Sequence, residues 1–402
     1  MHAEADEVLW EAKEELGEEY QDFRSSFSKS PLIFTAKKTS NLRRFLVRRT
    51  KINGVEEASQ LFWEICLMRH LGGHENLHEI ESVVYSPRAV YLFTKEFHTN
   101  MENIIFGQNQ LLTDHHVQFF LYNILRGLKF LHSANLVHGN IQPGSILSNA
   151  NDDHVIADLG TASIAGMPLS STSPLRFQAP EQLLGERTSK LEMDMWSVGC
   201  VLAEMLLQEP VFQAGDANID PVETEIALGE EDAERMMAFA MGLHARLGSD
   251  SPVRVLMDLV HPILELTVGP SAHCKAVLQC QLSVLGTPSE EELASLGPLA
   301  KRVFAELAPV PGEGFNDLFA NANPAGLDLL RRMLAFDPSK RPTAVEALDH
   351  LYLDEMHDPT DNPSFEKEVD LAAEYAACFS SSLGEVQTKL KAISAEYAQR
   401  QE

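Results

Sequence analysis

Two short stretches of the sequence carry polar side chains whose types and spacing could serve catalysis. Residues 136–149 read LVHGNIQPGSILSN, and ADLG follows at 157–160. A strand, a sharp loop and a second strand would bring the polar side chains of the first stretch near Asp158. These polar side chains could orient the hydroxyl group of a substrate. An amide such as that of Asn140, however, cannot accept the proton of that hydroxyl. The stretch could be a working catalytic loop, one that has lost its chemistry, or a chance turn.

The elements that would position this loop follow from the apolar periodicity. Residues 30–52 carry short apolar and β-branched runs separated by polar turns, which predicts two strands, and 83–93 predicts a further hairpin. Residues 55–71 change to helical spacing. From Leu112 the period is helical again, and Thr113 is the expected N-cap of a long helix that is buried along one face. Further helices are expected at 194–207, 271–285, 325–335 and 343–350.

The order of several motifs points to one fold. HGNIQPGSIL and ADLG are followed by QAPE at 178–181, DMWSVGC at 194–200 and FDPSKRP at 336–342. Each string is weak alone, but in this order the chain from about residue 20 to 357 resembles the eukaryotic protein kinase fold. The group is indicated by further strings that are similar to the mitogen-activated and cyclin-dependent (CMGC) kinases: HENL at 74–77, LGTPSEEEL at 285–293 and MLAFDPSKRPTAVEALDHLYL at 333–353.

This resemblance implies a bilobal α+β architecture. We expect a small β-rich N-lobe at 20–97 and a larger helical C-lobe at 98–357. An acidic helix at 1–19 would precede them, and a helical extension at 358–402 would follow. The segment 217–270 reads as an insertion in the C-lobe.

The residues that hold the fold of this family together are retained. Glu181 and Arg341 match the buried ion pair that ties the end of the activation segment to the helical lobe. Asp194 matches the aspartate that holds the catalytic-loop backbone. Met68, His138 and Leu159 match members of the hydrophobic spine. We therefore expect the scaffold to be kept.

The residues that match the catalytic loop of the family are changed. Asn140 stands at the position of the catalytic base, and Gln142 replaces a lysine that neutralises phosphate charge. Ser145 replaces an asparagine that binds the second magnesium ion, and Gly139 replaces an arginine that binds a phosphorylated activation loop. Asp158 is the one metal-ligand position retained, so no metal site is expected.

The nucleotide pocket is also changed. Its three loop glycines correspond to Ser26, Ser28 and Pro31, whose side chains occupy space where backbone must approach phosphate. Arg48 replaces the phosphate-binding lysine, and it could still form a structural ion pair with Glu64. Leu46 should narrow the base pocket. The degenerate pocket would then consist of Ser26, Ser28, Pro31, Ile33, Leu46, Arg48, Glu64, Thr94 and Asp158.

The activation segment at 161–178 has no T-x-Y motif. Ser170, Ser171, Thr172 and Ser173 could be modified, but a polar turn is the simpler interpretation because Gly139 cannot bind a phosphate.

Three functions are compatible with these residues. The first, which the changed residues favour, is a pseudokinase that is not an enzyme, binds ATP and magnesium weakly or not at all, and acts as a protein-binding scaffold or allosteric regulator. The second is a weakly active, atypical serine/threonine protein kinase that uses Asp158. The third is a structural subunit of a larger assembly.

Charge and composition limit the partners. A net charge of -27 disfavours nucleic acid, whereas basic protein partners are allowed. Partners, such as another kinase, could bind through 217–270 and 366–402, although packing extensions explain both segments equally well.

The cysteines and the apolar runs suggest the environment of the chain. The five cysteines are scattered without a C-x-x-C pair, and the cluster of His273, Cys274 and Cys280 is a weak metal candidate. No apolar run is long enough to span a bilayer. A soluble, cytoplasmic protein is expected.

Overall fold

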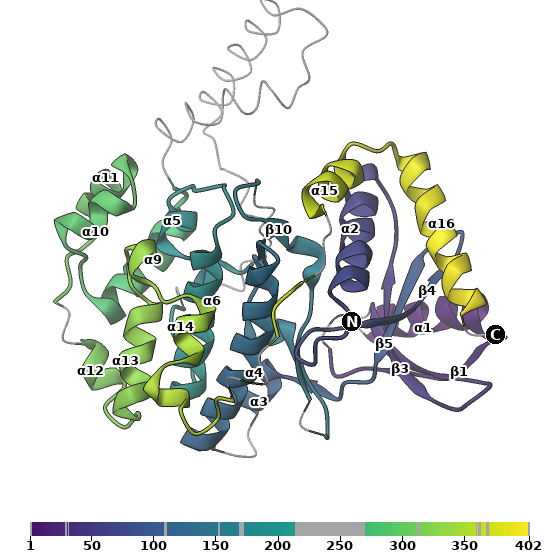
Figure 1. The fold of residues 1–402 in the computed structure, drawn as a ribbon, viewed down its shortest axis with the longest axis horizontal. Coiled ribbons are helices and arrows are strands. Elements are labelled where there is room, and N and C mark those ends of the chain that lie inside the picture. Colours follow the sequence, from purple (N-terminus) through teal and green to yellow (C-terminus); the bar gives the residue numbers. More distant parts are fainter. Residues whose placement is uncertain are drawn as a thin grey trace, which may run out of the picture. The chain divides into compact units, whose positions relative to one another are not determined.

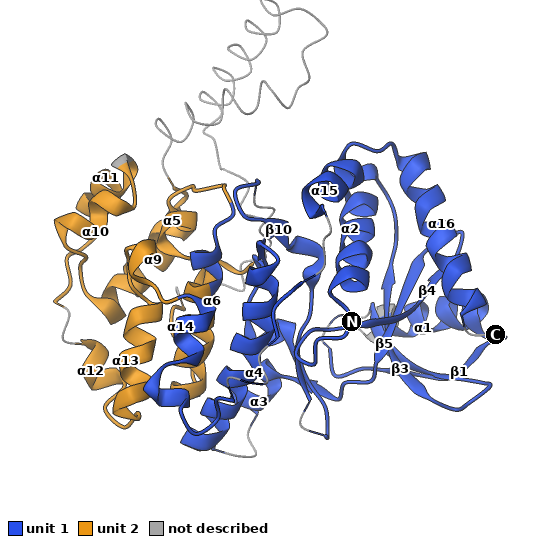
Figure 2. Cartoon of the chain, viewed as in Figure 1, with its two compact units in different colours: residues 1–171, 189–194, 343–402 blue, residues 172–188, 195–342 orange. Residues whose placement is uncertain are grey.

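The computed structural model describes residues 2–28, 30, 32–107, 111–151, 153–168, 173–213, 270–311, 314–358, 360, 363–366 and 370–400. The chain divides into two compact units (Figure 2). Unit 1 comprises Met1–Ser171, Ser189–Asp194 and Thr343–Glu402, and unit 2 comprises Thr172–Thr188 and Met195–Pro342. Each unit is described by itself.

A five-stranded antiparallel sheet forms the β-rich part of unit 1. Its strand order is β1-β2-β3-β5-β4, with β1 (Tyr20–Ser25), β2 (Ile33–Lys38), β3 (Arg44–Thr50), β4 (Ile80–Tyr85) and β5 (Val90–Lys95). Successive side chains of a strand point to opposite faces. Phe45 and Val47 of β3 therefore join an aromatic core cluster with Phe93, while Leu46 belongs to a different cluster. The predicted strand pairs at 30–52 and 83–93 are confirmed, and β1 was not predicted.

Helices cover this sheet. Helix α1 (His2–Leu16) places Val8, Ala12 and Leu16 in the aromatic core cluster. Helix α2 (Val55–Leu71) packs against α15 (Leu371–Phe379) and α16 (Leu383–Gln399), and α16 also packs against β4 (Figure 1). The described part of the segment 366–402 thus packs within its own unit.

Short strands and helices of unit 1 hold the polar loop. Thr113 is the N-cap of helix α4 (Asp114–Ser133), as the sequence predicts. Its hydroxyl accepts a hydrogen bond from the amide of His116. Before α4 the chain forms β6 (Thr99–Asn100) and α3 (Met101–Phe106), and α14 (Ala344–Leu348) packs on α4. After α4 it forms β7 (Leu136–Val137), β8 (Ile146–Ser148), β9 (His154–Ile156) and β10 (Ser163–Ile164). Two strand pairs, β7–β10 and β8–β9, fix the ends of the loop on both sides.

Unit 2 is helical in the part that the structure describes. It contains α5 (Pro180–Leu183), most of α6 (Leu191–Leu207), α9 (Ala272–Leu285), α10 (Glu290–Ser295), α11 (Pro298–Glu306), α12 (Gly314–Leu318) and α13 (Pro324–Met333). Leu278, Leu282 and Val303 belong to its apolar core. The predicted α+β class, with a sheet part and a helical part, is confirmed. The predicted insertion at 217–270 lies outside the described residues except for its last position.

None of the helices in the described ranges is both long and apolar enough to cross a membrane.

Shortening a buried side chain of the C-terminal helix α16 is expected to destabilise unit 1. Leu390 of α16 is fully buried, so Leu390→Ala should lower the free energy of unfolding by about 2–5 kcal/mol. Gln399→Ala, at an exposed position of the same helix, serves as the control and should change stability by less than about 0.5 kcal/mol. Urea unfolding measures both, and equal effects would show that α16 does not pack as described.

Candidate functional site

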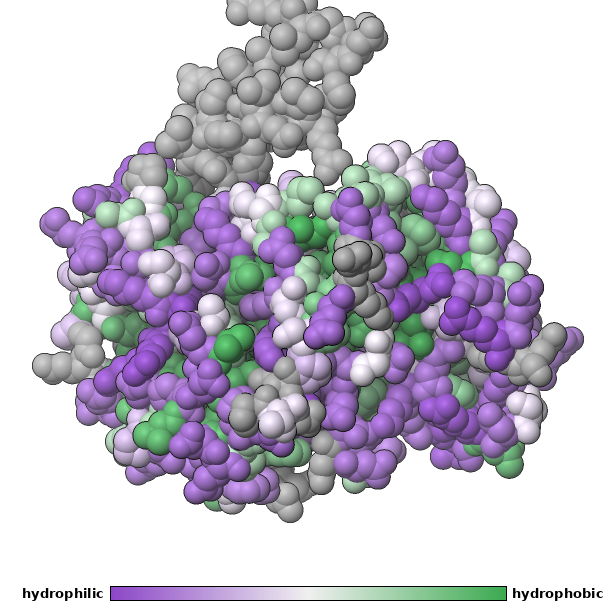
Figure 3. Space-filling model, in the orientation of Figure 1, coloured by the Kyte–Doolittle hydropathy of each residue, from purple (hydrophilic) through white to green (hydrophobic). Residues whose placement is uncertain are grey.

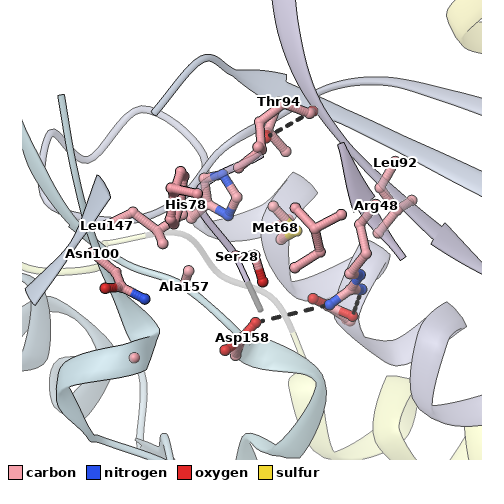
Figure 4. Close-up of a pocket in the computed structure, with 15 residues that line it drawn as sticks. Ser28, Arg48, Met68, His78, Leu92, Thr94, Asn100, Leu147, Ala157 and Asp158 are labelled. Atoms are coloured by element: carbon pink, nitrogen blue, oxygen red, sulfur yellow. Dashed lines mark hydrogen bonds and ion pairs between the residues drawn. The ribbon is translucent and has the colours of Figure 1, made fainter. Parts of the chain in front are cut away.

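A cavity of about 80 Å³ lies in unit 1 beside β3, β5 and α2 (Figure 4). Leu46 and Arg48 reach it from alternate positions of β3, and Leu92 and Thr94 do so from β5. The complete lining is Phe27, Ser28, Ile33, Leu46, Arg48, Glu64, Met68, His78, Leu92, Thr94, Asn100, Gly144, Leu147, Ala157 and Asp158. The strand period thus brings together residues far apart in the sequence.

Most of the residues predicted for the pocket line this cavity. They are Ser28, Ile33, Leu46, Arg48, Glu64, Thr94 and Asp158. Ser26 does not line it but donates a hydrogen bond to the carbonyl oxygen of Ile33 (2.9 Å), and Pro31 lies outside the described residues. Sequence reasoning missed Phe27 and His78. The alternation along β5 could have predicted Leu92, whereas no pattern marked His78.

One half of the cavity is apolar. Leu46, Leu147 and Ala157 belong to a buried cluster, and Phe27 and Ile33 pack against it. Phe27 belongs to the loop that joins β1 to β2, so this loop places an aromatic ring against the apolar wall. A flat heterocycle fits such a wall, but it must share the space with Phe27.

The other end of the cavity is charged. The guanidinium of Arg48 is ion-paired with Glu64, as the sequence predicts, and lies 4.0 Å from the carboxylate of Asp158 (Figure 4). A side chain added at Gly160 would lie 3.1 Å from the Glu64 carboxylate, so the glycine allows this close approach. Because Glu64 is buried and Asp158 is about half exposed, Arg48 is held mainly on α2.

The β1–β2 loop satisfies its own backbone amides. The amide of Ser28 donates to the hydroxyl of Ser26 (3.1 Å), that of Ser30 to Ser28 (3.1 Å), and that of Leu32 to Ser30 (3.3 Å). Loops that bind phosphate use free backbone N–H groups for it. Here serine hydroxyls already accept from three of these N–H groups, so the loop has less to offer a phosphate.

Asp194 fixes the backbone at the start of the polar loop at 138–145. Its carboxylate accepts hydrogen bonds from the amides of His138 (2.8 Å) and Gly139 (2.9 Å), as the sequence predicts. Gly139 adopts a φ of 74°, a conformation that glycine takes without strain. The His138 ring contacts the carbonyl oxygen of Ala157 at 2.8 Å, which connects the loop to the residue before Asp158.

The three remaining polar side chains of the loop bond to one another and to its backbone. The amide nitrogen of Gln142 donates to the amide oxygen of Asn140 (2.9 Å). Ser145 is fully buried, and its hydroxyl lies 3.0 Å from the carbonyl oxygen of Asn140 and 2.9 Å from that of Gln142. It also accepts from the amide of Gln142 (3.1 Å). The loop is a closed hydrogen-bond network in this state.

Unit 2 carries the buried ion pair that the sequence predicts. The Arg341 guanidinium meets Glu181 at 2.6 and 2.8 Å, and its Nε donates to the carbonyl oxygen of Ala335 (2.9 Å). Arg341 also stacks over the ring of Trp196 at 5.1 Å. Both charged side chains are buried, so the prediction of a structural pair is confirmed.

A family model for the protein kinase domain matches residues 32–353. The chain belongs to the protein kinase family. The match includes the whole cavity wall from Ile33 to Asp158, the polar loop and the Glu181–Arg341 pair. The motifs that suggested the family are therefore parts of one fold.

Several curated relatives of this kinase are mitogen-activated protein kinases. Mitogen-activated protein kinase 6 of Arabidopsis thaliana is 32% identical over 315 residues, which are 76% of this chain and 65% of that protein. Mitogen-activated protein kinase 5 of Oryza sativa subsp. japonica is 32% identical over 320 residues, 77% of this chain and 71% of that protein. The chain thus spans less than two thirds of the Arabidopsis relative. The predicted CMGC group is confirmed.

The prediction that the chain is not an enzyme is wrong. Its relatives are named as mitogen-activated protein kinases, which are active enzymes. The changes at Asn140, Gln142 and Ser145 were interpreted as a loss of all activity. Loss of a general base lowers a rate by about 10² to 10⁴ and does not bring it to zero.

Protein kinases take their phosphate from ATP with bound magnesium, so the prediction that this kinase needs no cofactor is in doubt. The apolar wall of the cavity is chemically suited to a purine base, but Phe27 packs against the same wall. The half that would hold phosphate and metal fits poorly, because Ser145 is buried and engaged and Arg48 is paired with Glu64. Within the described ranges, no three His, Cys, Asp or Glu side chains gather as a metal site.

His78 places an imidazole in the wall of the cavity. Its Nε2 has no hydrogen-bond partner among the described residues, and its ring meets that of Phe97 at 5.4 Å. Burial, with a smaller contribution from the charge of Arg48, lowers the pKa of His78 to about 3. The ring is therefore neutral in the folded kinase at neutral pH.

This low pKa makes stability depend on pH. Below about pH 6.5 the unfolded chain binds a proton at His78 while the folded chain does not, so stability falls as the pH falls from about 6.5 towards 3. His78→Leu should remove up to about 1.4 kcal/mol per pH unit of this dependence. His115→Gln, at an exposed position of α4, is the control. Urea unfolding at several pH values measures the slopes, and parallel slopes for wild type and His78→Leu would contradict the assignment.

The predicted modification sites in the activation segment are mostly undescribed. Ser170, Ser171 and Thr172 lie outside the described residues, and Ser173 is buried. Ser173 is thus shielded from modification in this conformation.

Proposed function

We propose that this protein kinase is a slow serine/threonine kinase that acts chiefly by binding other proteins. One observation carries the proposal: Asn140, Gln142 and Ser145 form hydrogen bonds within their own loop. The polar groups that should activate a substrate hydroxyl are therefore already engaged. Turnover is then limited by the missing base, while the retained fold still presents its surfaces.

The expected rate follows from the lost groups. Typical protein kinases turn over at about 1–100 s⁻¹. Loss of general-base catalysis lowers this by about 10² to 10⁴. The further changes at Gln142 and Ser145 do not multiply with it, because residues that act as one unit are not additive. Slow transfer, supported by Asp158 alone, is the expected behaviour.

Weak ATP binding is the second part of the proposal. The apolar wall formed by Leu46, Leu147 and Ala157 would hold the base, with Phe27 competing for the same surface. The triphosphate would gain little from the β1–β2 loop, whose amides are bonded to Ser26, Ser28 and Ser30. Magnesium should add little to the affinity.

A thermal-shift experiment tests this binding mode. A ligand at 100 times its dissociation constant stabilises a protein by about 2.7 kcal/mol, whereas one near its dissociation constant adds only about 0.4 kcal/mol. We expect a small shift with millimolar ATP that adenosine reproduces and that EDTA does not change. A large shift that requires both the triphosphate and magnesium would contradict weak binding.

Charge supports protein binding. The net charge is -27, and the face seen in Figure 3 is mainly hydrophilic, with hydrophobic residues scattered among the hydrophilic ones. A basic partner segment fits such a surface better than an apolar one, and its association should weaken as salt rises. Isolating the native complex at low and high salt and measuring its stoichiometry tests this. Partner binding that is unaffected by salt would contradict a charge-based interaction.

We also propose an intracellular location. Five cysteines occur and all are free thiols, which is typical of a reducing compartment.

A further inference from the structure

A second cavity of unit 1 lies where the C-terminal helices meet α2. Its volume is about 580 Å³, and its lining includes Cys66 and Arg69 of α2, Cys378 of α15 and Lys389 of α16. Figure 1 shows α15 beside one end of α2, with α16 continuing along the sheet. None of these residues belongs to the nucleotide cavity.

Helices α2 and α15 are held together by contacts on both sides of Cys66. The rings of Trp63 and Tyr375 meet edge to face at 5.1 Å. His70 lies 2.8 Å from the carboxylate of Glu374. Because Cys66 lies between Trp63 and His70 on α2, the packing fixes its position against α15.

Cys66 and Cys378 line the same cavity, on two helices that pack against each other, and an interaction between the two thiols shifts the pKa of each. A disulfide needs its sulfur atoms about 2 Å apart, and cysteines that face one cavity from packed helices approach this length by rotation of their side chains. Cys66 is half-buried and Cys378 is buried, but both line the cavity, which is large enough to admit a small oxidant.

The surroundings favour reaction at Cys378. The hydrogen bond from Cys66 and the charge of Lys389 lower the pKa of the Cys378 thiol, although burial opposes them. A thiolate is the nucleophilic form of cysteine. By contrast, burial raises the pKa of Cys200 and of Cys280.

We propose that Cys66 and Cys378 form a redox-modification site at which a hydroperoxide converts the two thiols to a disulfide, fastening the C-terminal helices to α2. The Cys378 thiolate attacks a peroxide oxygen, the O–O bond breaks, and a sulfenic acid and hydroxide form. The Cys66 sulfur then attacks the Cys378 sulfur, and the oxygen leaves as water with the Cys66 proton. With hydrogen peroxide, two sulfurs lose one electron each and the peroxide becomes two waters.

The proposed disulfide would also affect the first cavity, because α2 carries Glu64, the ion-pair partner of Arg48. The disulfide would fix α2 in the position that makes this ion pair. Cytosolic disulfides usually serve redox sensing, which agrees with an otherwise free-thiol protein. This inference does not depend on the rate of phosphoryl transfer.

Stepwise peroxide oxidation of the reduced, full-length protein tests the site. After alkylation and digestion, mass spectrometry should find the peptide that joins Cys66 to Cys378 before any oxidation of Cys274 or Cys280. The oxidised protein should unfold at a higher temperature by several degrees, and dithiothreitol should reverse the shift. Cys66→Ser should abolish both results, and Cys274→Ser should leave both unchanged.

Two results would overturn the proposal. In the first, Cys66 and Cys378 are still alkylated as free thiols when Cys280 is already oxidised. In the second, the disulfide forms equally fast in the urea-unfolded chain, which would show that the fold does not prepare it. Since Cys378 is buried and Cys378→Ser risks misfolding, the half-buried Cys66→Ser is the deciding variant.

Discussion

Replacing Asn140 with aspartate is expected to raise the rate of phosphoryl transfer by about 10² to 10⁴. The change supplies a carboxylate that can accept the proton of a substrate hydroxyl, at a position already held in place by Asp194 through His138 and Gly139. The Gln142 amide can still donate to it, because the hydrogen bond to Asn140 uses the oxygen that aspartate retains. Initial rates with labelled ATP and a basic protein acceptor measure the gain.

Asn103→Asp is the matched control for this variant. Asn103 lies on α3 in the same unit and is exposed, so the substitution adds the same charge away from the loop. It should leave the rate unchanged. If Asn140→Asp is no faster than Asn103→Asp, then the missing base is not what limits this kinase.

Glu181→Gln should cost about 3–5 kcal/mol of folding free energy, the usual cost of leaving one charge of a buried pair without its partner. The Arg341 guanidinium makes two contacts with Glu181, and its side chain is fully buried. Neutral glutamine keeps the shape but leaves the positive charge uncompensated in the core. Urea unfolding followed by fluorescence measures the loss.

The exposed pair of Asp328 and Arg332 provides the comparison. It lies on α13 of the same unit at 2.7 Å, with both side chains about half exposed. Asp328→Asn should therefore cost only about 0.3–0.5 kcal/mol. Equal costs for the two substitutions would mean that burial does not strengthen the dependence on Glu181.

Much of the fold could be predicted from local patterns. The capped start of α4 at Thr113 follows from its own residues and a few neighbours. The pair of Glu181 and Arg341 lies 160 positions apart, and it was predicted from motif order and not from spacing. The strand β1 was missed because YQDFRS has one fully buried position and no clear alternation.

The site was predicted less completely than the fold. Arg48 and Glu64 were identified because both belong to motifs of the family. His78 and Phe27 were not, since their place in the cavity depends on how strands from distant parts of the chain assemble. The hydrogen bonds that the hydroxyls of Ser26, Ser28 and Ser30 accept in the β1–β2 loop were not predicted either. The sequence argument considered only the space that side chains take up where the family has glycines.

The inference about activity failed for a different reason. The changes at Asn140, Gln142 and Ser145, together with those in the nucleotide pocket, were interpreted as a loss of activity because several requirements of phosphoryl transfer change at once. The relatives are named as mitogen-activated protein kinases, which contradicts that interpretation. The structure keeps Asp158 near Arg48 and connects the loop at His138 to Ala157, and slow transfer by this site is our proposal.

The most direct test is the turnover number of the purified wild-type kinase, measured with labelled ATP beside Asp158→Ala. Slow serine or threonine phosphorylation, about 10²- to 10⁴-fold below the usual 1–100 s⁻¹ of protein kinases and abolished by Asp158→Ala, is the result we predict. Turnover within the usual range would contradict slow catalysis, and transfer that survives Asp158→Ala would show that the activity does not come from this site.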